Sequence, residues 1–95
     1  IPGDQKAFSN QRLRQTKVLS SPRILEEKRV NINSLDGYLI HATGTDKDSR
    51  GELYIEQCLL FTDDGYYIFQ ALVGNERKEK FKSNFQEILE SFKRK

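Results

Sequence analysis

The sequence predicts an α+β domain, in which a four-stranded antiparallel meander sheet is followed by a C-terminal amphipathic helix and preceded by a weaker N-terminal helix. Three observations predict this fold class. Apolar residues recur at helical spacing near the C-terminal end, two alternating segments flank a turn in the middle of the chain, and two more strand-like segments precede them.

The chain of 95 residues is long enough for one small domain, which we expect to span residues 1–95. Its longest apolar run is four residues, as in residues 58–61, so a membrane-spanning helix is excluded. A single cysteine excludes an internal disulfide and a cysteine-rich zinc site. Because the sequence begins at Ile1 and not at an initiator methionine, we expect a processed or truncated part of a longer chain.

The predicted C-terminal helix lies within residues 77–95, where the apolar residues follow the spacing i, i+4, i+7, i+8, i+11. Its last turn carries Lys93, Arg94 and Lys95, which suit the negative end of the helix dipole. The basic tail therefore needs no ligand to explain it. The apolar stripe consists of Phe81, Phe85, Ile88, Leu89 and Phe92.

A β-hairpin is predicted over residues 51–75, with its turn at residues 62–65. A two-residue turn at Asp64-Gly65 would mix apolar and polar positions on each face. We prefer a three-residue loop with a bulge at Gly65, which pairs Phe61 with Tyr67. One face, to be covered by the C-terminal helix, then holds Leu53, Ile55, Leu59, Phe61, Tyr67, Phe69, Ala71 and Val73.

Two more strands are predicted upstream, over residues 24–33 and 38–45, and the turn signal Asp36-Gly37 introduces the second. Residues 4–20 carry no strand pattern, and their scattered apolar residues predict a weak amphipathic helix. Pro22 should separate that helix from the first strand, because proline disfavours continued helix.

Charge is distributed unevenly along the chain. Residues 1–30 hold seven basic and three acidic groups, residues 31–76 two and eight, and residues 77–95 seven and three. We interpret this pattern as solvation of the surface or packing of oppositely charged segments. Because the aromatic residues occupy core-like positions, we do not expect nucleic-acid binding.

The sequence holds no recognisable catalytic or metal site. His41 is the only histidine, and we expect a structural role for it and for Cys58. The carboxylates of Asp46, Asp48 and Glu52 suggest a calcium loop, but Arg50 occupies a ligand position and the closing bidentate glutamate is missing. We therefore expect no metal, no cofactor and no enzymatic activity.

The second face of the predicted hairpin is the best candidate for a recognition surface, since tyrosine rings and exposed apolar patches are typical of protein interfaces. We expect either a protein partner or a homodimer there. The alternative is that the N-terminal helix covers this face. The candidate residues are Tyr54, Leu60, Tyr66, Ile68 and Leu72.

Residues 30–40, 59–61, 66–69 and 85–93 resemble the PsbP/DcrB-like α/β sandwich superfamily. The shared pattern is a glycine-containing entry into a strand, a hairpin whose second strand contains Tyr-x-Ile/Phe, and a closing helix that ends in Ser-Phe-Lys/Arg. The resemblance covers about two thirds of the chain, which lacks the family's N-terminal strand pair and its tryptophan. It implies a domain without shared catalytic residues, often exported to the bacterial envelope and accompanying a larger partner.

We therefore expect a non-catalytic binding domain of an envelope-associated or secreted bacterial protein, placed outside the cytoplasm by the resemblance alone. The alternative is a cytosolic dimeric adaptor or a secretion-chaperone-like domain that dimerises through its sheet. Two further alternatives are an enzyme that uses Cys58 and His41, and an RNA-binding protein that uses the basic ends.

Overall fold

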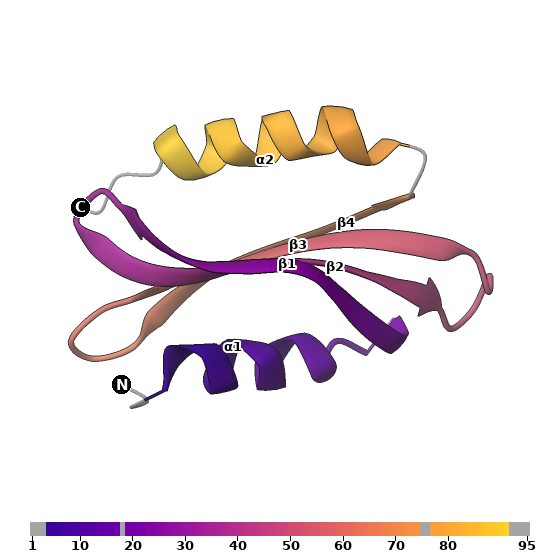
Figure 1. Cartoon of the computed structure of the whole chain (residues 1–95), viewed down its shortest axis with the longest axis horizontal. Helices are drawn as coiled ribbons and strands as arrows, with labels where there is room; N and C mark the ends of the chain where they lie inside the picture. The colour runs from indigo at the N-terminus through magenta and orange to yellow at the C-terminus, as the bar shows by residue number, and fades with distance from the viewer. Residues whose placement is uncertain (1–3, 18, 75–76, 92–95) are drawn as a thin grey trace.

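A four-stranded antiparallel sheet lies between two helices in the computed structural model of the chain, with one helix on each face (Figure 1). The elements are α1 (Gln5–Arg14), β1 (Leu19–Ile32), β2 (Leu35–Asp46), β3 (Glu52–Phe61), β4 (Tyr66–Gly74) and α2 (Lys78–Ser91). The structure describes residues 4–17, 19–74 and 77–91. The strands are ordered β1-β2-β3-β4, so the predicted α+β class and antiparallel meander are confirmed.

The turn between β1 and β2 is formed by Asn33 and Ser34, which have φ angles of 52° and 70°. A two-residue loop with left-handed residues matches the twist of the strands that it joins. The turn predicted at Asp36-Gly37 is therefore wrong. Both residues belong to β2, where Gly37 pairs with Val30, because the left-handed bend has already been made two residues earlier.

The edge strand β1 begins at Leu19, earlier than the predicted start at Ile24, and Pro22 lies inside it. The pairing of β1 with β2 shifts twice, between Ser20 and Arg23 and again between Ile24 and Glu26. Proline is tolerated on an edge strand because an outward N–H has no ladder partner to lose. The prediction that Pro22 separates helix from strand is wrong for this reason.

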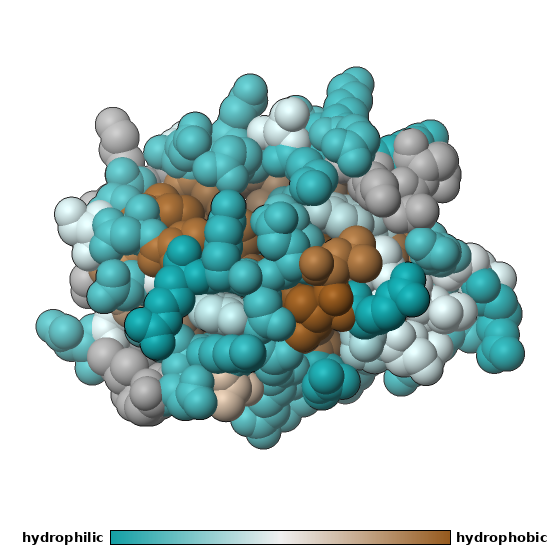
Figure 2. Space-filling model, viewed as in Figure 1, coloured by the Kyte–Doolittle hydropathy of each residue, from teal (hydrophilic) through white to brown (hydrophobic). Residues whose placement is uncertain are grey.

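Charged side chains dominate β1, which crosses in front of the sheet in Figure 1. Figure 2, seen from the same direction, shows mainly hydrophilic side chains with small apolar areas between them. Charges, a proline and irregular pairing are the features by which natural edge strands avoid pairing with other chains. The charged residues of β1 are Arg23, Glu26, Glu27, Lys28 and Arg29.

The β3–β4 hairpin has a four-residue loop, residues 62–65, and pairs Phe61 with Tyr66. The backbone N–H of Thr62 donates to the carbonyl oxygen of Gly65 at 2.9 Å, and its hydroxyl donates to Asp64 at 2.9 Å. The predicted pairing of Phe61 with Tyr67 is therefore wrong by one residue. Since successive side chains alternate between faces, this slip moves every residue of β4 to the other face relative to β3.

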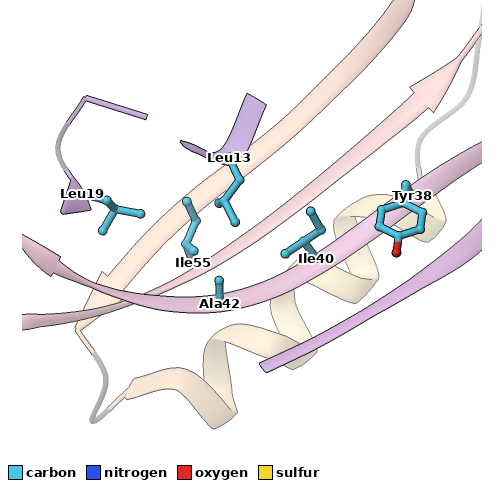
Figure 3. Packing of buried hydrophobic residues seen from close by; sticks show 6 residues of the cluster. All are labelled: Leu13, Leu19, Tyr38, Ile40, Ala42 and Ile55. Atoms are coloured by element: carbon cyan, nitrogen blue, oxygen red, sulfur yellow. The ribbon is translucent and has the colours of Figure 1, made fainter. Parts of the chain in front are cut away.

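The prediction assigned the C-terminal helix to the wrong face of β3. Helix α2 packs Phe85 and Leu89 onto Cys58 and Leu60. Helix α1 covers the opposite face, where Figure 3 shows side chains from α1, β1, β2 and β3 converging. Both faces of β3 are apolar enough to be buried, so alternation alone could not assign the helices. The side chains labelled in Figure 3 are Leu13, Leu19, Tyr38, Ile40, Ala42 and Ile55.

Helix α1 is shorter than predicted, because it begins after Asp4 and ends at Arg14. The carboxylate of Asp4 accepts a hydrogen bond from the backbone N–H of Ala7 at 3.0 Å, which is typical of a helix N-cap. The buried amide of Gln57 fastens the helix to the sheet by donating to the carbonyl oxygen of Ser9 at 2.9 Å. Of the predicted C-terminal helix, the apolar residue Phe92 and the basic residues 93–95 lie outside the described residues.

Candidate functional site

A buried polar cluster lies beneath α2 and joins the central strands β2 and β3. Nε2 of His41 lies 3.3 Å from Oε1 of Glu56, and the hydroxyl of Tyr54 donates to the same oxygen at 3.0 Å. Glu56 and Tyr54 are 2% and 1% exposed. Glu26 of β1 reaches the other side of the imidazole, where its carboxylate lies 3.8 Å from Nδ1.

Burial sets the protonation of this cluster. It raises the pKa of Glu56, although the hydrogen bond from Tyr54 and the nearby charge of Lys82 oppose the shift. Burial also lowers the pKa of His41, while the charge of Glu26 acts in the opposite direction. Both shifts favour the uncharged forms, which are the protonated carboxyl group of Glu56 and the neutral imidazole of His41. Tyr54, whose pKa burial raises, stays a neutral hydrogen-bond donor.

The cluster has the side chains of an acid–base site, but two of its members, Glu56 and Tyr54, are buried. Glu56 and Tyr54 are sealed between the sheet and α2, with the ring of Phe81 6.3 Å from that of Tyr54. A general acid or base must come within hydrogen-bond reach of its substrate. The sequence predicted a structural role for His41 but did not single out Glu56, whose signal is a charged residue in the middle of a mainly apolar strand. We assign the cluster a role in holding α2 on the sheet.

Cys58 is fully buried on the same face, and burial raises the pKa of its thiol to about 12. The thiolate is the reactive form of cysteine. We therefore expect Cys58 of the native protein to react slowly, at mildly alkaline pH, with an aromatic disulfide that releases a coloured thiolate. Labelling should reach one thiol per chain only in denaturant. Rapid labelling of the native protein would contradict this account and revive the enzyme that uses Cys58 and His41.

The loop between β2 and β3 uses its aspartate internally. The carboxylate of Asp46 accepts hydrogen bonds from the backbone N–H groups of Asp48 and Ser49, at 2.8 and 3.3 Å, and these bonds lower its pKa. Among the described residues, no three histidine, cysteine, aspartate or glutamate side chains gather as metal ligands. The carboxylate that suggested a calcium loop thus closes its own turn.

The five predicted interaction residues do not share one face. Tyr54 and Leu60 are buried under α2. The one-residue slip in register places Tyr66, Ile68 and Leu72 on the face that α1 covers. Tyr66 and Ile68 are 37% and 38% exposed, and Leu72 is half-buried. The α1 face therefore keeps the three residues of β4, and the two residues of β3 belong to the core.

Exposed apolar side chains gather at the β4 edge of the sheet. Five large apolar residues of the described ranges are prominently exposed, and three of them are consecutive in β4: Tyr66, Tyr67 and Ile68. Tyr66 and Ile68 lie on the α1 face and Tyr67 on the α2 face, so apolar surface flanks the edge on both sides. The ring of Phe8 packs 5.1 Å from that of Tyr66 and supports it from α1.

Ile88 extends this surface along α2. Asn84 lines a shallow cavity of about 550 Å³ together with Val73 of β4, so this side of the helix faces β4. Gln86 lines a cavity with β1 on the other side. Ile88 is four residues after Asn84, on the same side of the helix, and is 54% exposed. Ile88 belongs to the apolar stripe predicted for this helix, but it lies outside the two buried clusters.

The two edges of the sheet differ in their protection. Strand β4 consists of nine residues without a charge or a proline, and its pairing with β3 is regular throughout. Strand β1 carries five charges, a proline and two register shifts. An edge strand turns alternate backbone N–H and C=O groups outward, ready to pair with another chain. Only β4 leaves that row unguarded by these devices.

The comparisons with known proteins match this architecture and nothing more specific. No family model matches the chain, and no curated protein matches it in sequence. The chain is similar to a solved structure, PA94 of Pseudomonas aeruginosa, a protein of unknown function, with a TM-score of 0.76 at 10% identity. The match covers 95% of this chain and 61% of that one, so the chain spans less than two thirds of its neighbour's length.

At this identity the likeness shows the fold alone: an α+β domain with one antiparallel sheet. The resemblance of residues 30–93 to the PsbP/DcrB-like superfamily stays a prediction.

Proposed function

We propose that the chain is a non-catalytic interaction domain that binds another polypeptide by adding its strand to the open edge of β4. The observation that carries this proposal is the contrast between a charged, irregular β1 edge and a regular, uncharged β4 edge. Strand addition draws its affinity from main-chain hydrogen bonds and its specificity from alternate side chains. At about 3.3 Å per residue, nine residues offer an edge of about 30 Å.

The side chains around β4 supply the apolar contacts that such a strand needs. Tyr66 and Ile68 present partly exposed apolar surface on one face of the edge, and Tyr67 and Ile88 present it on the other. The tyrosine ring supplies apolar area and its hydroxyl supplies a polar group, which suits a surface that is solvated in the free protein and buried in the complex. The His41–Glu56 cluster supports the non-catalytic part of the proposal, because its carboxyl group, Glu56, is buried. The envelope location stays a prediction from the resemblance.

Selection of peptides from a random displayed library tests this function. The protein is immobilised sparsely, so that copies do not contact one another, and selected peptides are assayed on two variants. We expect extended, alternately apolar peptides that bind wild type and Leu25→Lys but not Ile68→Lys, because lysine on an edge strand opposes strand addition. Leu25 is the matched control, 48% exposed on the opposite edge.

Peptides that bind Ile68→Lys as tightly as wild type would overturn the proposed edge. Failure to enrich any peptide would contradict the proposed function itself.

A further inference from the structure

We propose that the polypeptide that occupies the β4 edge is a second copy of this chain, paired antiparallel through β4 to form a continuous eight-stranded sheet. This inference rests on the proposed function and names its partner. It depends on two properties of β4 and its flanks, the order of side-chain sizes along the strand and the charges at its two ends.

The order of side-chain sizes along β4 suits antiparallel self-pairing. A two-fold axis through Gln70, the middle residue of Tyr66–Gly74, pairs the three aromatic residues near the start with smaller residues near the end, and pairs Ile68 with Leu72, which has the same size. Opposite residues in an antiparallel pair share a face and contact each other. The resulting pairs are Tyr66 with Gly74, Tyr67 with Val73, Ile68 with Leu72, and Phe69 with Ala71.

Gln70 suits the position on the axis because its side chain is held in place. Its Nε2 donates to Oε1 of Gln57 at 2.8 Å and to the hydroxyl of Thr16 at 3.1 Å. These bonds join the centre of β4 to β3 and to the segment after α1. The side chain at the axis is neutral, so two copies bring no like charges together at the centre of the pair.

Opposite charges flank the strand. Asp63 and Asp64 precede β4, and residues 75–82 after it contain four basic residues and two acidic residues. Antiparallel pairing brings the acidic turn of one copy to the basic end of the other, at both ends of the interface. Asp63 and Arg77 are both exposed and are therefore available for this contact. Parallel pairing would place like charges side by side, so the charges favour the two-fold arrangement.

Sedimentation velocity from low to high micromolar concentration tests the pairing. We expect wild type and Leu25→Lys to approach the dimer mass, and Ile68→Lys to raise the dimer dissociation constant at least about thirtyfold, the loss typical of a central interface residue. Thermal unfolding by circular dichroism establishes that the two lysine variants are folded. A wild type that stays monomeric throughout, or an Ile68→Lys that dimerises like wild type, would overturn the proposal.

A charge exchange tests the geometry with two exposed residues, Asp63 and Arg77. Asp63→Lys and Arg77→Glu should each weaken self-association, because each homodimer then holds two repulsive contacts. An equimolar mixture of the two variants should dimerise better than either alone, since both contacts between unlike copies are attractive. A mixture that associates no better than the single variants contradicts the antiparallel arrangement.

The two experiments separate the inference from the function on which it rests. A monomeric protein whose β4 edge binds selected peptides rejects the second copy and leaves strand addition in place. A monomeric protein that also selects no peptide rejects both.

Discussion

Replacing Gly37 with alanine is expected to destabilise the fold by at least about 3 kcal/mol, which is the upper range for overpacking a core. Gly37 lies in β2 between Val30 of β1 and Leu60 of β3. A Cβ atom built there overlaps the backbone carbonyl oxygen of Leu59 and comes within 2.7 Å of Cδ2 of Leu60. Because the first obstacle is backbone, the two central strands would have to separate locally. Urea unfolding followed by far-ultraviolet circular dichroism measures the loss.

Gly65 provides the matched control. An added Cβ at Gly65 meets nothing within 4 Å, and its φ angle is not in the left-handed region. We therefore expect Gly65→Ala to change the free energy of unfolding by less than about 0.5 kcal/mol, as for an ordinary surface substitution. Equal effects of the two substitutions would show that β2 and β3 do not approach as closely at Gly37 as described.

Substitutions of Glu56 and of His41 are expected to give opposite dependences of the free energy of unfolding on pH. The folded state raises the pKa of Glu56, so its contribution to stability grows as pH falls through the folded pKa towards the unfolded value of 4.5. The folded state lowers the pKa of His41, so its contribution is lost as pH falls below the unfolded value of 6.5. A variant that lacks Glu56 keeps only the pH dependence due to His41, and a variant that lacks His41 keeps only the pH dependence due to Glu56.

Glu56→Gln should therefore lose stability, and His41→Gln should gain it, when pH is lowered from about 7.5 to about 5.5. The slope contributed by one titrating proton cannot exceed about 1.4 kcal/mol per pH unit in either variant. Glu26 and Lys28 of β1, Tyr54 of β3, and Glu79 and Lys82 of α2 face or influence the pair and are unchanged in both variants. Unfolding in urea at each pH gives the two slopes. Parallel slopes would mean that the pair does not titrate in the buried environment described.

The sequence carries enough periodicity to predict the elements but not how they face one another. The alternation in residues 51–75 and the helical spacing after residue 77 identify the hairpin and α2. The hairpin register depends on whether the loop holds two, three or four residues, and Thr62 and Gly65 close a four-residue loop by a backbone hydrogen bond. A slip of one residue exchanges the two faces of β4, and no local pattern distinguishes these loops when both faces are apolar.

The candidate surface was predictable only in part, for the same reason. Tyr66 and Ile68 were named from the sequence because large apolar residues on a second face suggest a partner, and both are exposed. Tyr54 and Leu60 were named with them because the helix was assigned to the wrong face of β3. Ile88 follows the helical spacing of a core residue, yet its side chain is exposed and is not buried against the sheet. The contrast between the edges could not be stated until the strand order had placed β1 and β4 at them.

The protection of individual β4 backbone amides against hydrogen exchange, followed by NMR as a function of protein concentration, tests the central claim most directly. In an isolated domain, the amides of Tyr66–Gly74 that point away from β3 exchange rapidly, and those bonded to β3 are protected. Pairing of two β4 edges predicts that the outward amides become protected as concentration rises, in alternation along the strand, while the outward amides of β1 do not change. Outward β4 amides that exchange equally fast at every concentration would contradict it.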